Sequence, residues 1–77
     1  MSDEDRPRML TLTDVAEILN TSLAQVTALV RRGELRAFKL GGRGQWRVET
    51  LELEKFVARM YEQTEEHVRG YNAAHAD

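Results

Sequence analysis

Residues 22–32, SLAQVTALVRR, carry the start and stop signals of a short amphipathic helix. Ser22 is a favourable N-cap residue, and Gln25 three positions later completes the pattern of a capping box. Three apolar residues recur at helical spacing and predict a buried face: Val26, Leu29 and Val30. Gly33 follows where helices commonly end in a residue with positive φ. The stretch therefore predicts a helix with defined ends and one apolar side.

The opposite side of this predicted helix is small and polar at its start and cationic at its end. It carries Gln25, Thr27, Ala28, Arg31 and Arg32. Side chains of these types can reach base edges and phosphates when a helix lies in the major groove of DNA. We therefore treat this face as a candidate contact with nucleic acid.

Residues 11–19 predict a preceding helix. Thr11 is the expected N-cap, and Asp14 at the third helical position serves as a shorter partner in a capping box. Residues 20–21 then interrupt the apolar pattern before the next cap. Two short helices joined by a tight turn form a helix-turn-helix arrangement, although many small helical bundles contain such a hairpin and bind nothing.

Residues 35–40 and 45–48 alternate between apolar and polar positions on either side of the glycine-rich residues 41–44, which predicts a β-hairpin. The expected inner face consists of Phe38, Leu40, Trp46 and Val48. The expected outer face presents Lys39 and Arg47, with Arg43 at the tip. A phosphate-binding loop is not expected here, because no helix follows the glycines directly and no Lys-Ser/Thr pair is present.

A last helix is expected to open at residues 49–50 and to run to about Val68, with Gly70 as its stop. Its apolar stripe is Leu53, Phe56, Val57 and Met60. The fold class is therefore mainly α with a two-stranded β-hairpin wing, a winged helix-turn-helix. We expect residues 1–9 to form a disordered N-terminal arm, residues 10–69 the folded domain, and residues 70–77 a frayed tail.

The chain has 77 residues and no cysteine, which indicates one small domain without disulfides or a cysteine-based zinc site. No apolar run is long enough to span a membrane and the start is acidic, so we expect a cytoplasmic protein without a membrane partner. His67 and His75 have no third ligand at metal-binding spacing, and no nucleophile–base pair is evident. We expect no metal, no catalytic residue, no cofactor and no enzyme activity.

The charge of the chain is unevenly distributed. Its net charge is −2, yet residues 25–48 hold six Lys and Arg side chains against Glu34 alone. A local basic patch matters more for phosphate binding than the total charge. The alternative is that these charges form an ordinary solvated surface.

Two strings, LTLTDVAEILNTS and AQVTALVRRGELRAFKLGGRGQWRVETLELEKF, closely resemble the excisionase-like and MerR-like winged helix-turn-helix family. The resemblance covers residues 10–57. Its most specific parts are Val15-Ala16 with Leu19, the RRGEL segment at residues 31–35, and the wing ending in Trp46-Arg47-Val48. Ala28 departs from the family, in which a larger polar residue often stands, and the wing loop is richer in glycine.

The resemblance implies sequence-specific binding to double-stranded DNA, with residues 22–32 in the major groove and the wing of residues 36–48 on the flanking backbone or minor groove. The implied contacts are Gln25, Thr27, Ala28, Arg31, Arg32, Lys39, Arg43 and Arg47. The chain would act as a small transcriptional regulator or an excisionase-like recombination accessory factor. We expect no small-molecule effector, because no effector domain follows the last helix.

Two further questions stay open at the level of sequence. A winged-helix scaffold can also serve as a protein-interaction module that does not bind DNA. The last helix contains a poor heptad seam at Leu53, Val57, Met60, Thr64, His67 and Tyr71, whose first members can equally close the core of a monomer. We therefore expect a monomer or weak dimer that assembles cooperatively on DNA.

Overall fold

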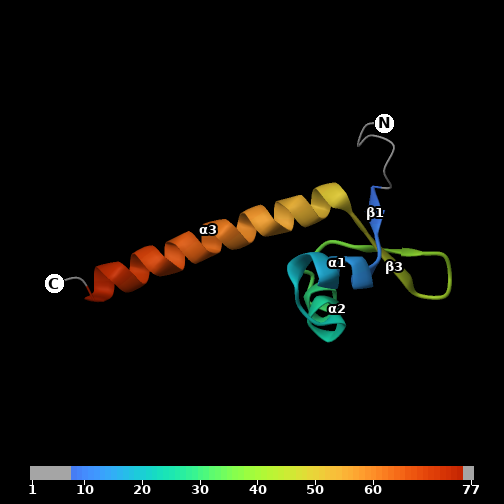
Figure 1. Cartoon of the computed structure of the whole chain (residues 1–77), viewed down its shortest axis with the longest axis horizontal. Helices are drawn as coiled ribbons and strands as arrows, with labels where there is room; N and C mark the ends of the chain where they lie inside the picture. The colour runs from blue at the N-terminus through green and yellow to red at the C-terminus, as the bar shows by residue number, and fades with distance from the viewer. Residues whose placement is uncertain (1–7, 76–77) are drawn as a thin grey trace.

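The computed structural model describes residues 8–75, and the side chains of residues 8–70 within them. The elements are β1 (Met9–Leu10), α1 (Leu12–Leu19), α2 (Leu23–Arg31), β2 (Phe38–Leu40), β3 (Gln45–Glu49) and α3 (Thr50–His75). Figure 1 shows α1 and α2 close together beside the sheet, while α3 extends far to one side. The winged helix-turn-helix predicted from the sequence is confirmed, with a third strand added to the expected hairpin.

The ends of α1 and α2 follow from their capping residues. The Thr11 side chain accepts a hydrogen bond from the Asp14 backbone N–H, and Asp14 accepts one from the Thr11 backbone N–H, which confirms the predicted capping box. At α2, Ser22 Oγ accepts from the Gln25 backbone N–H at 3.0 Å. The reciprocal Gln25 bond is not among the hydrogen bonds of residues 8–70, so the box at α2 is only half formed.

Backbone geometry closes the turn between the helices and the exit from α2. Asn20 adopts the left-handed conformation with φ 56° and donates its backbone N–H to the carbonyl oxygens of Ala16 and Glu17. Asparagine tolerates this conformation better than most residues. Gly33 has φ 78°, as expected for the residue that ends α2.

The three strands lie in the order β1-β3-β2, with β3 in the centre. The hydrophobic core lies where both short helices, the central strand β3 and the start of α3 meet. It consists of Val15, Ala16, Val26, Leu29, Leu35, Val48, Leu53 and Phe56. Leu35 is 1% exposed although it lies in the irregular segment after α2, whereas the sequence pattern predicts a strand there. Each of these residues removes apolar surface from water, so the core fixes α2 relative to every other element that contributes to it.

The first strand corrects the predicted N-terminal arm. Met9, expected in that arm, pairs with Glu49 in an antiparallel ladder, and Leu10 pairs with Val48. The ladder continues to the carbonyl oxygen of Arg8, which accepts hydrogen bonds from the backbone N–H of Thr50 at 2.8 Å and from its hydroxyl at 3.2 Å. This pairing joins the start of the folded chain to the start of α3. The rest of the predicted arm, residues 1–7, lies outside the described residues.

The wing pairs in a register that overturns its predicted faces. Leu40 lies opposite Gln45, Lys39 opposite Trp46, and Phe38 opposite Arg47. Directly opposed residues of an antiparallel pair point to the same side, so Lys39 shares a face with Trp46 and Arg47 with Phe38. The cause is the length of the four-residue loop. Because this length is even, each even-numbered residue of β2 lies opposite an odd-numbered residue of β3. The predicted faces required even-numbered residues to lie opposite one another, and a shift of one residue exchanges the two faces of a strand.

The last helix is longer than predicted. It continues through Gly70 to His75, although the sequence suggests a stop at Gly70 and a frayed tail from there. Gly70 is not among the glycines with positive φ, so it acts as an ordinary helical residue at a cost of about 1 kcal/mol relative to alanine. Leu53 is buried and Val57 and Met60 pack against the core, so these members of the heptad seam close the monomer.

Leu35 offers a direct test of how thin this core is. Replacing it with alanine removes a side chain that is 1% exposed and should cost about 2–5 kcal/mol. A domain of this size has only about 3–5 kcal/mol to lose. We predict that Leu35→Ala is largely unfolded in a urea titration followed by circular dichroism. Leu51→Ala, at a position 58% exposed, should shift the midpoint little, and equal effects of the two changes would contradict this core.

Candidate nucleic-acid interface

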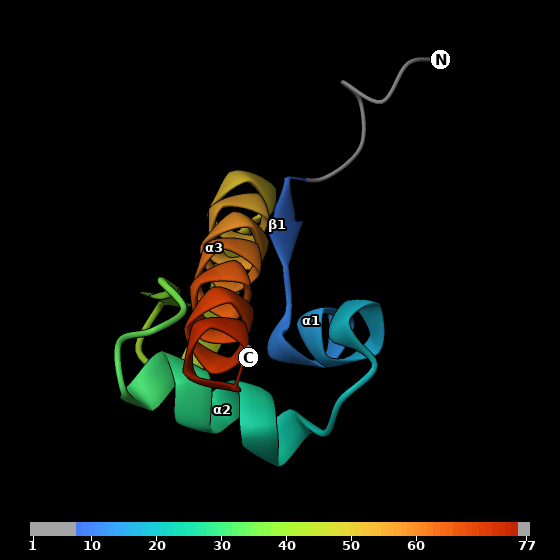
Figure 2. The ribbon, with the colours of Figure 1, turned by 90° about the vertical axis from the view of Figure 1, so that its left-hand side faces the viewer.

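The outward face of α2 is defined by the residues that point inward. Val26 and Leu29 are buried, and the 100° step of an α-helix places Ala24, Ala28 and Arg31 on the opposite side. Figure 2 shows α2 along the lower edge of the molecule, with α1 and α3 above it. The face centred on these three residues is therefore turned away from the rest of the fold.

The five predicted positions on α2 occupy this face unequally. Gln25, Arg31 and Arg32 are exposed, whereas Thr27 and Ala28 are half-buried. Gln25 and Arg32 lie on one flank of the face and Thr27 on the other. The prediction omitted Ala24, which is exposed and belongs to the centre of the face. Ala24 could have been found by choosing the residues that lie opposite Val26 and Leu29 on the helix, because the prediction selected residues by their polarity.

The two arginines at the end of α2 differ in their surroundings. Arg32 Nε lies 3.0 Å from Glu34 Oε2, and both side chains are about half exposed. Arg31 makes no ion pair with another described residue. An exposed ion pair of this kind contributes little, about 0–1 kcal/mol, so a phosphate can replace Glu34 as the partner of Arg32. Both cations can therefore face an anionic ligand.

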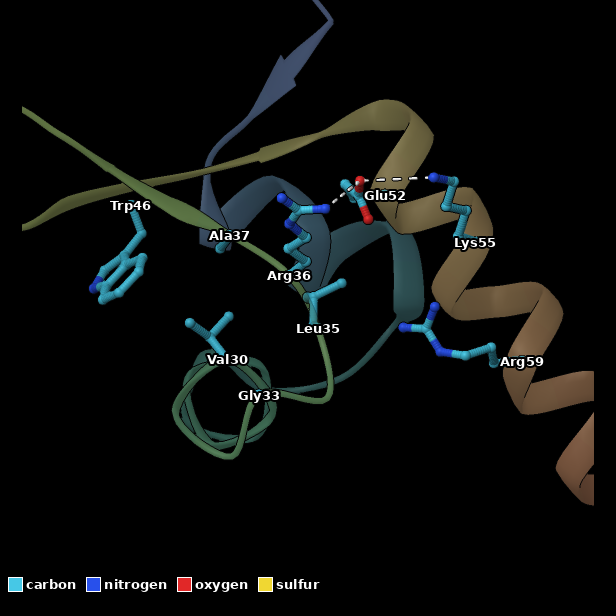
Figure 3. Close-up of a pocket in the computed structure, with 9 residues that line it drawn as sticks. All are labelled: Val30, Gly33, Leu35, Arg36, Ala37, Trp46, Glu52, Lys55 and Arg59. Atoms are coloured by element: carbon cyan, nitrogen blue, oxygen red, sulfur yellow. Dashed lines mark ion pairs between the residues drawn. The ribbon is translucent and has the colours of Figure 1, made fainter.

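On the wing, Lys39 lies on the side that faces α2. Its Nζ is 5.6 Å from the centre of the Trp46 ring, within the range of a cation–π interaction. Trp46 lines the same groove as Val30 and Gly33 at the end of α2, and Figure 3 shows its ring pointing toward that side. Lys39 and the cationic end of α2 thus border one surface.

The other two wing cations occupy different places. Arg43 is exposed in the loop of residues 41–44, between glycines with positive φ. Arg47 is half-buried on the far face of the hairpin, and its Nη1 donates to the Trp46 carbonyl oxygen at 2.9 Å. The predicted common face for Lys39 and Arg47 is therefore wrong, since the wing carries one cation on each face and one at its tip.

Trp46 also departs from its predicted role in the core. It is half-buried and stands outside the core cluster. It lies at one end of an open groove of about 610 Å³ between the end of α2, the start of the wing and α3. The groove has an apolar floor of Val30, Leu35 and Ala37, and its charged side chains are Arg36, Glu52, Lys55 and Arg59 (Figure 3). This mainly cationic groove was missed because its residues lie far apart in the sequence.

Two other properties of the described residues bear on possible ligands. Among the described side chains, which are those of residues 8–70, no group of three or more His, Asp or Glu is placed to hold a metal ion. No helix within residues 8–75 is long and apolar enough to cross a membrane.

Comparison with known proteins identifies the family to which this arrangement belongs. The sequence profile described as "Helix-turn-helix domain" matches residues 9–61, from β1 into α3. No curated protein and no solved structure matches the chain significantly. The profile covers more than half of the 77 residues and spans every element of the wing and both short helices. The chain is therefore a member of the helix-turn-helix domain family.

Proposed function

We propose that the chain binds double-stranded DNA in a sequence-specific manner, as a small transcriptional regulator or an excisionase-like recombination accessory factor. The observation that carries this proposal is the outward face of α2, which contains no residue of the hydrophobic core and ends in two exposed arginines. Membership of the helix-turn-helix domain family supports DNA as the partner. The excisionase-like assignment rests on the resemblance of the α2 exit and the wing.

In this proposal, α2 lies in the major groove. Gln25 would pair with adenine, and Thr27 or Ala28 would contact a thymine methyl group. The two arginines at the end of α2 supply phosphate contacts, because guanidinium groups bind phosphate oxygens in two parallel hydrogen bonds. The small side chains of Ala24 and Ala28 let the helix backbone approach the base edges closely.

The wing supplies the flanking contacts. A hairpin with a cation on each face and one at its tip fits a groove bordered by two phosphate backbones. In such a groove Lys39 would face one strand, Arg47 the other, and Arg43 would enter between them. The register of the hairpin supports this arrangement, because it is what separates Lys39 from Arg47.

A second candidate function is a protein-interaction module that uses this scaffold without DNA. It is favoured by two exposed apolar side chains of the wing, Phe38 at 40% and Leu40 at 50%. Titration with duplex DNA of random sequence at two salt concentrations separates the two functions. Binding that weakens steeply with salt supports the DNA interface, and no binding at low salt supports the interaction module.

We further propose that the chain is a monomer or weak dimer in free solution and assembles cooperatively on DNA. A single domain of this size reads only a short stretch of groove, and specific affinity usually requires two or more copies. No small-molecule effector is needed for such assembly.

The wing cations should be visible in the salt dependence of binding. We predict that Lys39→Ala and Arg43→Ala each weaken binding to all sequences and lower the slope of log K against log salt by about one. The measurement is fluorescence anisotropy with a short duplex that holds one copy. Arg69→Ala on the outer half of α3 is the matched control and should leave the slope unchanged. A slope unaffected by both wing changes would remove the wing from the phosphate contacts.

Gln25 should set one position of the recognised site. We predict that Gln25→Ala lowers discrimination at a single base pair by about 1–3 kcal/mol, because the bidentate pairing with adenine is lost. Selection of bound duplexes from a random pool, repeated for the variant, measures this. Glu17→Ala in α1 removes an exposed side chain outside α2 and should leave the preference unchanged. An identical preference in the Gln25 variant would exclude this residue from base recognition.

A further inference from the structure

A stripe of six charged residues runs along α3 at spacings of three and four. It consists of Glu52, Lys55, Arg59, Glu62, Glu66 and Arg69. Residues at this spacing share one face of a helix. That face points away from Leu53, which packs in the core, and the first three members border the groove of Figure 3.

The outer half of α3 packs against nothing in the described chain. Residues 61–70 are all exposed, although a helical segment of this length without tertiary packing is marginal in water. The charges of the stripe act in both directions, because its pairs three residues apart are opposite in sign whereas its pairs four residues apart, Lys55 with Arg59 and Glu62 with Glu66, are alike. The exposure of the outer half therefore points to a partner for it.

The order of the charges indicates which partner fits. Read from Glu52 to Arg69, the signs are negative, positive, positive, negative, negative, positive. Read in the reverse direction, each sign is the opposite. Two antiparallel copies related by a two-fold axis between Met60 and Tyr61 would therefore place opposite charges together along the whole stripe. The facing pairs are Glu52 with Arg69, Lys55 with Glu66, and Arg59 with Glu62. A parallel pair in register would place like charges together throughout.

The charge of the groove beside α3 is complementary to that of the outer half of α3. It presents three cations, Arg36, Lys55 and Arg59, against the single carboxylate of Glu52. The outer half of α3 is rich in glutamate and would enter the groove of the second copy. Glu52 Oε2 lies 3.7 Å from Arg36 Nη1 and 3.9 Å from Lys55 Nζ. Both ion pairs are long, so they can rearrange at little cost in free energy.

We propose that the partner is a second copy of this chain, whose outer α3 docks antiparallel into the groove bordered by Lys55 and Arg59. Exposed ion pairs are individually weak, so this contact is weak in free solution and sensitive to salt. On DNA, two adjacent copies face each other at a high effective concentration, and the same contact then makes the binding of the two copies cooperative. This consequence rests on the proposed DNA binding, whereas the contact itself does not.

Charge exchange tests the register. Lys55→Glu alone and Glu66→Lys alone each place like charges together at two symmetric positions of the pair. Each should lower self-association in sedimentation velocity, and cooperativity on a two-site duplex, by about fivefold. The double variant Lys55→Glu/Glu66→Lys restores opposite charges and should regain both. An equimolar mixture of the two single variants should also associate, because the glutamate that replaces Lys55 in one copy then meets the lysine that replaces Glu66 in the other.

Thr64→Lys is the matched control, because residue 64 is exposed and points about 160° away from residue 66 on the same helix. It should leave association unchanged, and circular dichroism should show the same helix content in all variants. Single variants that associate like the wild type, or a double variant that stays impaired, would overturn the proposal. If Lys55→Glu lowers self-association and Glu66→Lys does not, the proposal is also overturned, in favour of an acidic partner protein. Weaker binding of Lys55→Glu to a one-site duplex would likewise overturn it, in favour of a phosphate contact. Failure of all DNA binding would instead reject the proposed function, since sedimentation tests the contact without DNA.

Discussion

The burial of Val26 and Leu29 of α2 is the interaction on which the rest of this structure depends. These two side chains are clamped by apolar residues from α1, the segment after α2, the central strand and the start of α3. A helix of nine residues is not stable in water by itself, so α2 exists because this core holds it. The same burial turns Ala24, Ala28 and Arg31 outward, and the surface that we propose to contact DNA is therefore a consequence of the packing.

Local chemistry made both short helices predictable from the sequence. Caps such as Thr11 with Asp14, and a glycine such as Gly33, act over three or four residues and leave a readable signal. To predict the register of the wing strands, the length of the loop must be considered together with the apolar pattern. The four-residue loop alone determines which side each wing residue faces, yet the apolar pattern of Phe38 and Leu40 suggested the opposite assignment. Both residues prove to be exposed, which shows that apolar alternation is a weak guide in a strand that covers no core.

Features that depend on distant parts of the chain were not readable in this way. Met9 gave no strand signal, because its pairing with Glu49 is set by the fold and covers only two residues. The groove beside α3 combines residues from α2, the wing and α3, which only the folded structure brings together. The charged stripe of α3 is present in the sequence, but the apolar heptad pattern beside it gives the more familiar signal. Two members of that seam, Val57 and Met60, pack against the monomer core, whereas the first three members of the charged stripe line the open groove.

We propose that the fold holds α2 with its outward face toward DNA and with the wing beside it. The most direct test is an NMR titration of the isotopically labelled chain with a duplex that holds one copy. We predict that the largest amide shifts fall in residues 24–32 and in the wing loop at residues 41–44. The amides of exposed residues in α1, such as Glu17, should shift little. Tight binding with shifts concentrated on α1 or on the outer half of α3 would contradict this placement of DNA.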